Sequence, residues 1–222
     1  MSNIPEASAS PPPRLVISLA TYNEAENVEP LVAGIRDFAP DASILIIDDN
    51  SPDGTGAIAE RLAGTLKDVA VIHRAGKLGL GTATLEAMAY AIRNGFDYLL
   101  NMDVPGGGVE GEFNLKRKFM STGINMYART FLGLKTRDNS GAFRCYRVSK
   151  LAQIDFTKVR SRGYSFQEEI LFWCRQVGCR FGETPILFEN RRAGMSKINS
   201  REAAAALWII FRLGLGRLLG RV

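Results

Sequence analysis

The 222-residue sequence contains a single histidine, His73, and only three cysteines. One histidine excludes a histidine-rich metal site, and Cys145, Cys174 and Cys179 lack the spacing of zinc ligands. An odd number of scattered cysteines also argues against a disulfide framework. We therefore expect a protein of the reducing cytosol.

Long uncharged apolar runs are also lacking. The most apolar stretch, 203–219, has 17 residues and includes two arginines and two glycines, which is marginal for a membrane span. We expect an amphipathic helix that lies in the membrane interface, with a buried core helix as the alternative. No signal peptide opens the sequence, and residues 1–13, rich in Ser, Ala and Pro, are expected to form a disordered tail.

The charged residues leave a formal net charge of +5, which favours an anionic partner such as a nucleotide, a lipid phosphate or a nucleic acid. Aromatic side chains are not interleaved with the basic runs, as stacking on bases would require. No nucleic-acid partner is therefore expected.

Short apolar runs alternate with amphipathic segments through the first 103 residues. Strands are predicted at 15–19, 43–47, 69–73 and 98–102, and helices at 23–38, 55–66 and 79–94. This alternation predicts an α/β fold with a mostly parallel sheet flanked by helices. Beyond it we predict helices at 115–134, 167–177 and 203–219, a strand at 140–148, and a strand pair or bent strand at 179–188.

Polar side chains follow the ends of these predicted strands. Tyr22 follows the first strand, Asp48 and Asp49 the second, and Asp103 the fourth. Ligands of open parallel sheets bind beyond the carboxyl ends of the strands, so we expect a site there. Carboxylates at such positions accept hydrogen bonds from a base or a ribose, and they also bind Mg²⁺ or Mn²⁺.

Several of these residues also have a purely structural interpretation. Asp53 or Thr55 alone could cap the second helix, and Asn23 could cap the first. Gly79 and Gly81 could let the backbone approach a phosphate, or could simply open a helix. The basic runs at 116–118 and 191–192, together with Lys197, are either phosphate ligands or a solvated surface.

The ordered set of motifs resembles the polyprenol-phosphate (dolichol-phosphate) mannosyltransferases, inverting family 2 glycosyltransferases of the Rossmann-like GT-A fold. The matching segments are 21–24 (TYNE), 47–55 (IDDNSPDGT), 77–82 (KLGLGT), 101–103 (NMD), 115–118 (LKRK), 140–147 (SGAFRCYR), 163–169 (GYSFQEE) and 191–197 (RRAGMSK).

This resemblance implies transfer of a hexose, typically mannose from GDP-mannose, to a polyprenyl or dolichyl phosphate with inversion. Residues 14–200 would form the glycosyltransferase GT-A domain and 201–222 a membrane-associated helix. The protein is expected to be cytoplasmic and peripheral at the cytosolic face of the membrane. Its partners would be a nucleotide sugar donor, a polyprenyl phosphate acceptor and the membrane surface.

The resemblance also implies residue roles. The donor-binding residues would be Ala20, Tyr22, Glu24, Asp48, Asp49, Lys77, Arg191 and Lys197, with Ala20 standing where the family usually has proline. The acceptor phosphate would lie near Lys116, Arg117 and Ser121. Asp103 would be the first carboxylate of an Asp-x-Asp metal site for Mg²⁺ or Mn²⁺, and the catalytic set would be Asp103, Arg117 and Arg191.

One departure from the family follows Asp103. The chain runs directly into Val104, Pro105 and Gly106, where the family continues with a second carboxylate and then a further helix and strand. Such a unit is on the order of 30 residues, and its loss exposes a sheet edge. The metal site is therefore expected to be incomplete. The alternative function is a catalytically impaired homologue that binds a nucleotide sugar or a membrane.

Overall fold

Residues 11–103, 115–184 and 200–220 are described in the computed structural model of the protein, with the backbone alone at 103, 115–122, 124 and 200–203. The elements in chain order are β1 (Leu15–Thr21), α1 (Val28–Phe38), β2 (Ser43–Asp48), α2 (Thr55–Thr65), β3 (Val69–His73), α3 (Leu80–Arg93), β4 (Tyr98–Asp103), α4 (Leu115–Leu132), β5 (Arg144–Arg147), α5 (Val148–Leu151), the 3₁₀ turn η1 (Phe156–Lys158), α6 (Phe166–Gln176) and α7 (Ser200–Leu218).

The strands form one sheet in the order β3-β2-β1-β4-β5. The first four strands are parallel to one another, and β5 runs antiparallel to β4. In the register, Thr21 lies opposite Asp48 and Ala20 lies opposite Asp103. The carboxyl ends of β1, β2 and β4 therefore meet at one edge of the sheet, as the alternation of strands and helices predicts.

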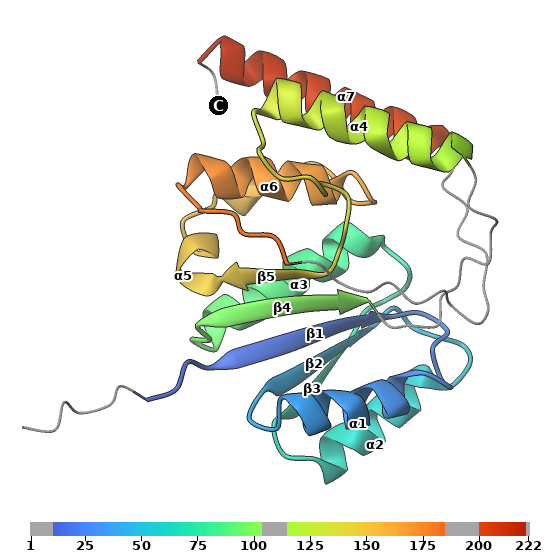
Figure 1. Ribbon diagram of the computed structural model, residues 1–222. Helices are drawn as coiled ribbons and strands as arrows, with labels where there is room; N and C mark the ends of the chain where they lie inside the picture. Colours follow the sequence, from blue (N-terminus) through green and yellow to red (C-terminus); the bar gives the residue numbers. More distant parts are fainter. Residues whose placement is uncertain (1–10, 104–114, 185–199, 221–222) are drawn as a thin grey trace, which may run out of the picture.

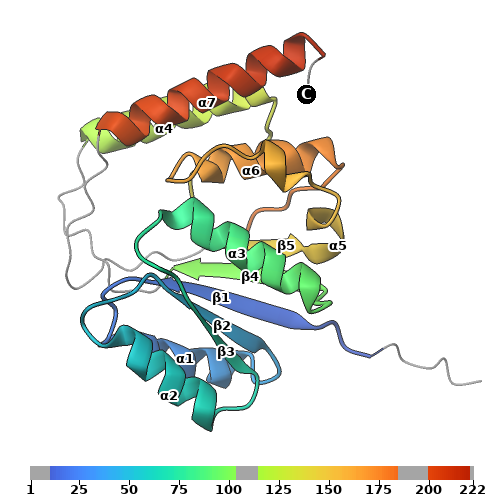
Figure 2. The same ribbon diagram turned by 180° about the vertical axis from the view of Figure 1, so that it is seen from behind.

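Two hydrophobic clusters cover the two faces of the sheet. Helices α1 and α2 lie on one face, and α3 lies on the other, with α6 beyond it (Figures 1 and 2). The central strands β1 and β2 are apolar on both sides, with buried residues throughout, because each face packs against helices. The predicted mostly parallel α/β fold is confirmed.

Helices α4 and α7 lie side by side and form an outer layer over α6 (Figure 1). The face of α7 that points inward carries Ile209, Ile210 and Leu213, all buried in the larger cluster. This face matches the expected alternative of a core helix. The opposite face is apolar and exposed, and the expected place of this helix in a membrane interface stays a prediction. No helix in the described ranges is long and apolar enough to cross a membrane.

Several element boundaries differ from the sequence prediction, and three of the differences have a local cause. The first helix begins at Val28 rather than 23, because Asn23 has a φ of 60° and the backbone N–H of Glu24 donates to a side chain of the next loop. Helix α4 ends at Leu132, just before Gly133, whose φ of 65° is left-handed. The strand predicted at 140–148 is confined to β5, because Asp138 Oδ1 accepts hydrogen bonds from the backbone of Ser140 and Gly141 and forms a turn there.

The strand pair or bent strand predicted at 179–188 is wrong for residues 179–184, which have no regular structure, while 185–188 lie outside the described residues. Within the described part of the chain, β5 pairs with β4 alone and is an edge strand. A cavity of about 740 Å³ lies beside β5 and is lined by Cys145, Arg147, Phe181 and neighbouring residues. An exposed sheet edge was expected from the missing helix–strand unit.

Candidate functional site

Two loops at the carboxyl edge of the sheet are joined by a row of hydrogen bonds. In each case a backbone N–H of the β1–α1 loop donates to a side chain of the β2–α2 turn or of the first residue of α2: Asn23 to Ser51 Oγ (3.1 Å), Glu24 to Thr55 Oγ1 (2.9 Å) and Ala25 to Asp53 Oδ2 (3.1 Å). Asn23 and Asn50 both have a positive φ, which asparagine tolerates better than most residues. The two loops thus form one fixed unit.

Asp53 and Thr55 act within this unit as the structural interpretation predicts. Asp53 Oδ1 accepts from the backbone N–H of Thr55 at 3.0 Å and from its hydroxyl at 2.6 Å. Partial burial disfavours the Asp53 carboxylate, but the hydrogen bonds from Thr55 and Ala25 outweigh it and lower the pKa of Asp53. Both side chains are therefore used in holding the turn.

Asp48 is buried and its oxygens face the protein. Oδ1 accepts from the Ser51 hydroxyl at 2.5 Å and from the Thr21 hydroxyl at 3.2 Å, and Oδ2 accepts from the Ser51 backbone N–H at 3.1 Å. These bonds offset the desolvation cost of placing a carboxylate at the end of a buried strand. In this structure Asp48 shapes the turn, and its predicted contact with a donor stays a prediction.

Asp49 and Arg74 form an ion pair between the ends of β2 and β3. Arg74 Nε donates to Asp49 Oδ1 at 2.5 Å, and Nη1 donates to the Thr82 hydroxyl at 2.6 Å. Burial raises the pKa of Asp49, against the lowering effect of Arg74. Arg74 is not among the residues predicted from the sequence, although it directly follows β3 as Asp49 directly follows β2.

Tyr22 and Lys77 are in contact with each other, and Lys77 is near enough to Asp49 to lower its pKa. The ammonium of Lys77 lies 4.3 Å from the centre of the Tyr22 ring, although one residue follows β1 and the other precedes α3. The Tyr22 side chain is 37% exposed, so the ring remains partly accessible to a ligand. Glu24, 7% exposed, lies in the same loop and accepts a hydrogen bond from Asn27. The structure therefore brings together Tyr22, Glu24, Asp49 and Lys77 from the predicted donor set.

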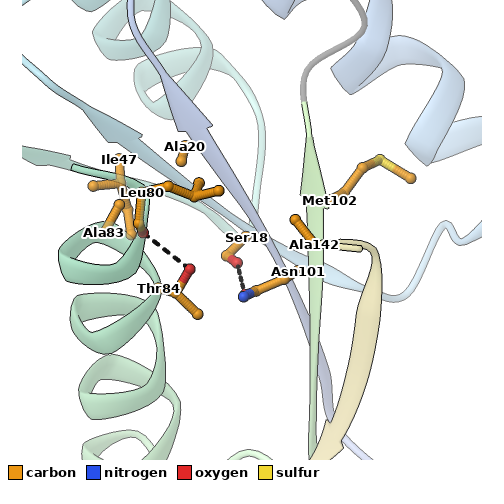
Figure 3. A pocket seen from close by; sticks show the side chains of 9 residues that line it. All are labelled: Ser18, Ala20, Ile47, Leu80, Ala83, Thr84, Asn101, Met102 and Ala142. Atoms are coloured by element: carbon orange, nitrogen blue, oxygen red, sulfur yellow. Dashed lines mark hydrogen bonds between the residues drawn. The ribbon is translucent and has the colours of Figure 1, made fainter. Parts of the chain in front are cut away.

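Ala20 lines a different and much smaller pocket (Figure 3). In it the Ser18 hydroxyl donates to the Asn101 side-chain oxygen at 2.5 Å, between β1 and β4. The Thr84 hydroxyl of α3 donates a hydrogen bond to the carbonyl oxygen of Leu80 (Figure 3). The pocket is too small for a sugar or a base, and its lining residues come mainly from the sheet and α3, so it is part of the packing between them.

The predicted glycine-rich stretch packs against another part of the chain. A Cβ on Gly81 would lie 2.6 Å from Cβ of Phe166, and a Cβ on Gly79 would lie 2.5 Å from the carbonyl oxygen of Arg162. Gly81 also donates its N–H to that carbonyl at 2.9 Å. These contacts favour the structural interpretation of the two glycines. They join the start of α3 to the segment before α6.

Asp103 ends β4 opposite Ala20, at the same edge as the cluster. Among the described side chains no group of three or more His, Cys, Asp or Glu residues could hold a metal ion. Magnesium does not require such a cage, because it is commonly held by one or two carboxylates together with substrate phosphates. Lys116, Arg117 and Ser121 belong to α4, and only the backbone is described at these three positions. Arg191 and Lys197 lie outside the described residues.

A second polar cluster lies at the start of α6. Arg144 Nη1 donates to the carbonyl oxygen of Gln167 at 2.7 Å and to Gln167 Oε1 at 3.1 Å. Arg144 Nη2, Gln167 Nε2 and Glu168 Oε2 are buried without a hydrogen-bond partner among the described atoms. Burial raises the pKa of Glu168 to about 7, against a lowering effect of Arg144 and with a small raising effect of Asp138.

The raised pKa of Glu168 predicts a pH-dependent stability. Because the folded state favours the protonated carboxyl, its contribution is fully present below the unfolded value of 4.5 and is lost as pH rises through about 7. We expect Glu168→Gln to flatten the fall in the free energy of unfolding between pH 5 and pH 8, by an amount on the order of 3 kcal/mol. Urea unfolding at both pH values measures this, with the exposed Glu26→Gln as control. Equal pH slopes in Glu168→Gln and the parent protein would contradict it.

Comparison with known proteins places the chain in a family. Residues 17–104 match the model of glycosyl transferase family 2. The chain is 32% identical over 242 residues to the polyprenol monophosphomannose synthase of Mycolicibacterium smegmatis, covering 96% of this chain and 91% of that protein. It is 31% identical over 229 residues to the undecaprenyl-phosphate mannosyltransferase of Micrococcus luteus, covering 91% of this chain and 94% of that protein.

Solved structures match the fold over most of the chain. Mannosyl-3-phosphoglycerate synthase from Rubrobacter xylanophilus superposes with a TM-score of 0.60 at 15% identity, covering 94% of this chain and 75% of that one. Glucosyl-3-phosphoglycerate synthase from Mycobacterium tuberculosis, solved with Mn²⁺ and UDP-glucose, gives 0.54 at 17% identity, covering 95% and 80%. At such identities the likeness speaks for the fold alone. With the sequence matches, it establishes that this chain is a glycosyltransferase of family 2 with the predicted GT-A fold.

Proposed function

We propose that the protein transfers mannose from GDP-mannose to a polyprenyl phosphate, with inversion of the sugar, at the cytosolic face of a membrane. The names of the two curated relatives support a polyprenyl phosphate acceptor and a mannosyl donor. The observation that carries the proposal is the cluster of Tyr22, Asp49, Arg74 and Lys77 beyond the parallel strands. This is where α/β folds of this type bind nucleotides.

The cluster offers complementary contacts for a nucleoside diphosphate. The exposed part of the Tyr22 ring is a surface on which a base can stack. Asp49, held by Arg74, presents a carboxylate that can accept hydrogen bonds from the base or the ribose. Lys77 carries the positive charge next to them that a diphosphate requires.

The reaction needs no protein nucleophile. The acceptor phosphate is already anionic, so its oxygen attacks the anomeric carbon while the bond to the nucleoside diphosphate breaks, which inverts that carbon. The protein then contributes position and charge, with Lys77 on the donor side and Arg117 and Arg191 as the further cations that we propose. Mg²⁺ or Mn²⁺, when bound at Asp103, would neutralise the leaving diphosphate.

A direct assay tests the proposed reaction. The full chain is incubated with radiolabelled GDP-mannose, undecaprenyl phosphate and Mn²⁺, and labelled lipid is extracted into organic solvent. We expect labelled lipid with GDP-mannose and far less with labelled UDP-glucose. Transfer from UDP-glucose alone would overturn the donor assignment, and transfer to water alone would overturn the acceptor.

An impaired homologue is the second candidate, favoured by the chain around Asp103. Val104 and Pro105 stand where the second metal carboxylate is expected. The match to the mycobacterial relative extends over more positions than this chain has residues, so the relative carries additional residues within it. Calorimetric titration with GDP-mannose, with and without Mn²⁺, separates the candidates when it is combined with the transfer assay, because an impaired homologue binds donor but forms no labelled lipid.

The membrane part of the proposal rests on the outward face of α7. Its exposed apolar side chains recur at helical spacing and are Leu207, Trp208, Phe211, Leu215 and Leu218, and the exposed Leu219 follows the end of the helix. Trp208 is 64% and Leu218 78% exposed. An amphipathic helix with such a face lies in the membrane interface, and the exposed Arg212 adds charge that favours anionic lipid.

We expect the double variant Trp208→Asp, Leu218→Asp to lose binding to membranes. Burying one such side chain contributes about 1.5–3 kcal/mol, so partitioning should weaken by at least about 10-fold. Flotation with vesicles of phosphatidylcholine and phosphatidylglycerol measures this. Phe38→Asp is the matched control, because Phe38 is 93% exposed at the end of α1, far from α7 (Figure 1). Equal flotation of the double variant and the parent chain would refute a membrane role for α7.

A further inference from the structure

The C-terminal end of α6 brings two of the three cysteines together. Val177 is the C-cap, and Gly178 follows with a φ of 72°, in the left-handed region. The backbone N–H of Cys179 donates to the carbonyl of Cys174 at 2.9 Å, and that of Gly178 to the carbonyl of Arg175 at 3.0 Å. These two bonds define a Schellman motif, in which the side chains five residues apart come into contact.

In this motif the contacting side chains are thiols. The two thiols are close enough to interact, and each shifts the pKa of the other. Cys174 is 3% exposed, whereas Cys179 is partly exposed. Both line the cavity of about 740 Å³ beside β5, which gives small molecules a way to the buried sulfur. A pair of adjacent thiols, one accessible and one behind it, is the arrangement of a redox-sensitive dithiol.

The surroundings favour attack by Cys179. The hydrogen bond from Cys174 lowers the pKa of Cys179 to about 7, against the effect of burial, and Lys150 lowers it further. Lys150 is fixed nearby, because its ammonium donates to the carbonyl oxygen of Val177 at 2.8 Å. The same hydrogen bond and burial raise the pKa of Cys174. Cys179 is thus the thiolate that attacks first, and Cys174 is the thiol that then closes the disulfide.

We propose that Cys174 and Cys179 form a peroxide-sensitive dithiol that closes to an intramolecular disulfide. The Cys179 thiolate attacks one oxygen of hydrogen peroxide, breaking the O–O bond, and yields a sulfenic acid and, after proton uptake, one water. The Cys174 sulfur then attacks the Cys179 sulfur, its proton leaves with the hydroxyl as a second water, and the S–S bond forms. Two thiols are oxidised and one peroxide is reduced.

The proposal does not depend on the sugar-transfer reaction. A disulfide here would link the last turn of α6 to the residue after its cap, on the helix that carries Gln167 and Glu168. In a reducing compartment the thiols remain reduced, so the disulfide would form only under oxidative conditions. The reaction therefore adds a reversible covalent modification site to the protein.

The test uses the full native chain treated with a few equivalents of hydrogen peroxide. We expect titratable thiols to fall from three to one, with Cys145 remaining, and dithiothreitol to restore all three. Trypsin cuts after Arg175, between the two cysteines, so the disulfide appears as peptides 163–175 and 176–180 linked until reduction. Linkage of either peptide to the Cys145 peptide instead, or loss of thiols without linkage, would overturn the proposal.

Two variants separate the roles of the sulfurs. Cys174→Ser should leave Cys179 to form a sulfenic acid that dimedone traps, at least ten times faster than in Cys179→Ser, where the buried Cys174 remains. Cys145→Ser is the matched control and should form the linked peptides as the parent chain does, because Cys145 is exposed on β5. Equal rates of dimedone labelling in Cys174→Ser and Cys179→Ser would contradict the assignment of Cys179 as the attacking residue.

Discussion

Replacing Asp49 by leucine should both destabilise the protein and remove its affinity for the donor nucleotide. The Arg74 guanidinium would remain buried without its carboxylate, and breaking such a pair costs about 3–5 kcal/mol. Loss of the carboxylate that we assign to the base or ribose should weaken GDP-mannose binding by about 10- to 100-fold, since hydrogen bonds to charged groups contribute about 1.5–3 kcal/mol. Urea unfolding and isothermal titration calorimetry measure the two effects.

The double variant Asp49→Leu, Arg74→Met distinguishes a binding pair from a structural one. Replacing both members of a buried pair by apolar residues is often close to neutral for stability, so the double variant should regain most of the lost free energy of unfolding. If the pair serves the donor, affinity stays lost. If affinity returns together with stability, the pair is structural and the donor assignment of Asp49 is wrong. Asp41→Asn, at an exposed carboxylate, should change neither quantity.

The position of this pair could be only half predicted from the sequence. A buried apolar strand followed by two acids predicts a polar site at a strand end, and Asp49 is found there. Arg74 was not predicted, because a single arginine after a strand is usually a solvent-exposed side chain. Its role depends on the order β3-β2-β1-β4, which places the ends of β2 and β3 side by side. Applying the same strand-end rule to β3 would have identified it.

The two acids at the end of β2 also show that the local sequence pattern does not predict the orientation of a side chain. Asp48 and Asp49 are adjacent, yet Asp48 turns toward Thr21 and Ser51, while Asp49 turns toward Arg74. Consecutive residues of a strand point to opposite faces of the sheet, so the two adjacent acids meet different partners. The sequence predicts that two carboxylates occur here, and the fold determines which side chains surround each of them.

The contact between Cys174 and Cys179 could have been predicted from the glycine that follows α6. Gly178 after an apolar helix predicts a left-handed cap, and that cap places residues five apart in contact. Counting cysteines and their spacing treats Cys174 and Cys179 as scattered, because a cap contact is not a metal-ligand spacing. The unpredicted helix α5 has no such signal, since its four residues are too few to show a periodicity.

A large effect of a single methyl group is expected at Gly81. Gly81→Ala places its Cβ within 3 Å of Phe166 and of the carbonyl oxygen of Arg162, so α3 and the segment before α6 must move apart. Overpacking of this kind costs about 1–3 kcal/mol, despite alanine's better helix propensity, and should lower the Tm by several degrees. Differential scanning calorimetry measures this shift.

Gly64→Ala provides the matched comparison, with an expected change of opposite sign. Gly64 lies in the helix α2, is exposed, and has no atom within 4 Å of the position a Cβ would take. The substitution should stabilise the protein by about 0.4–1 kcal/mol, because alanine restricts the unfolded chain. The pair also decides between the two interpretations of the glycine-rich stretch. If Gly81 exists for packing, Gly81→Ala loses stability while the folded protein keeps its affinity for GDP-mannose. If Gly81→Ala keeps its Tm but loses that affinity, the glycine is there for the approach of a phosphate, and the contact with Phe166 is incidental.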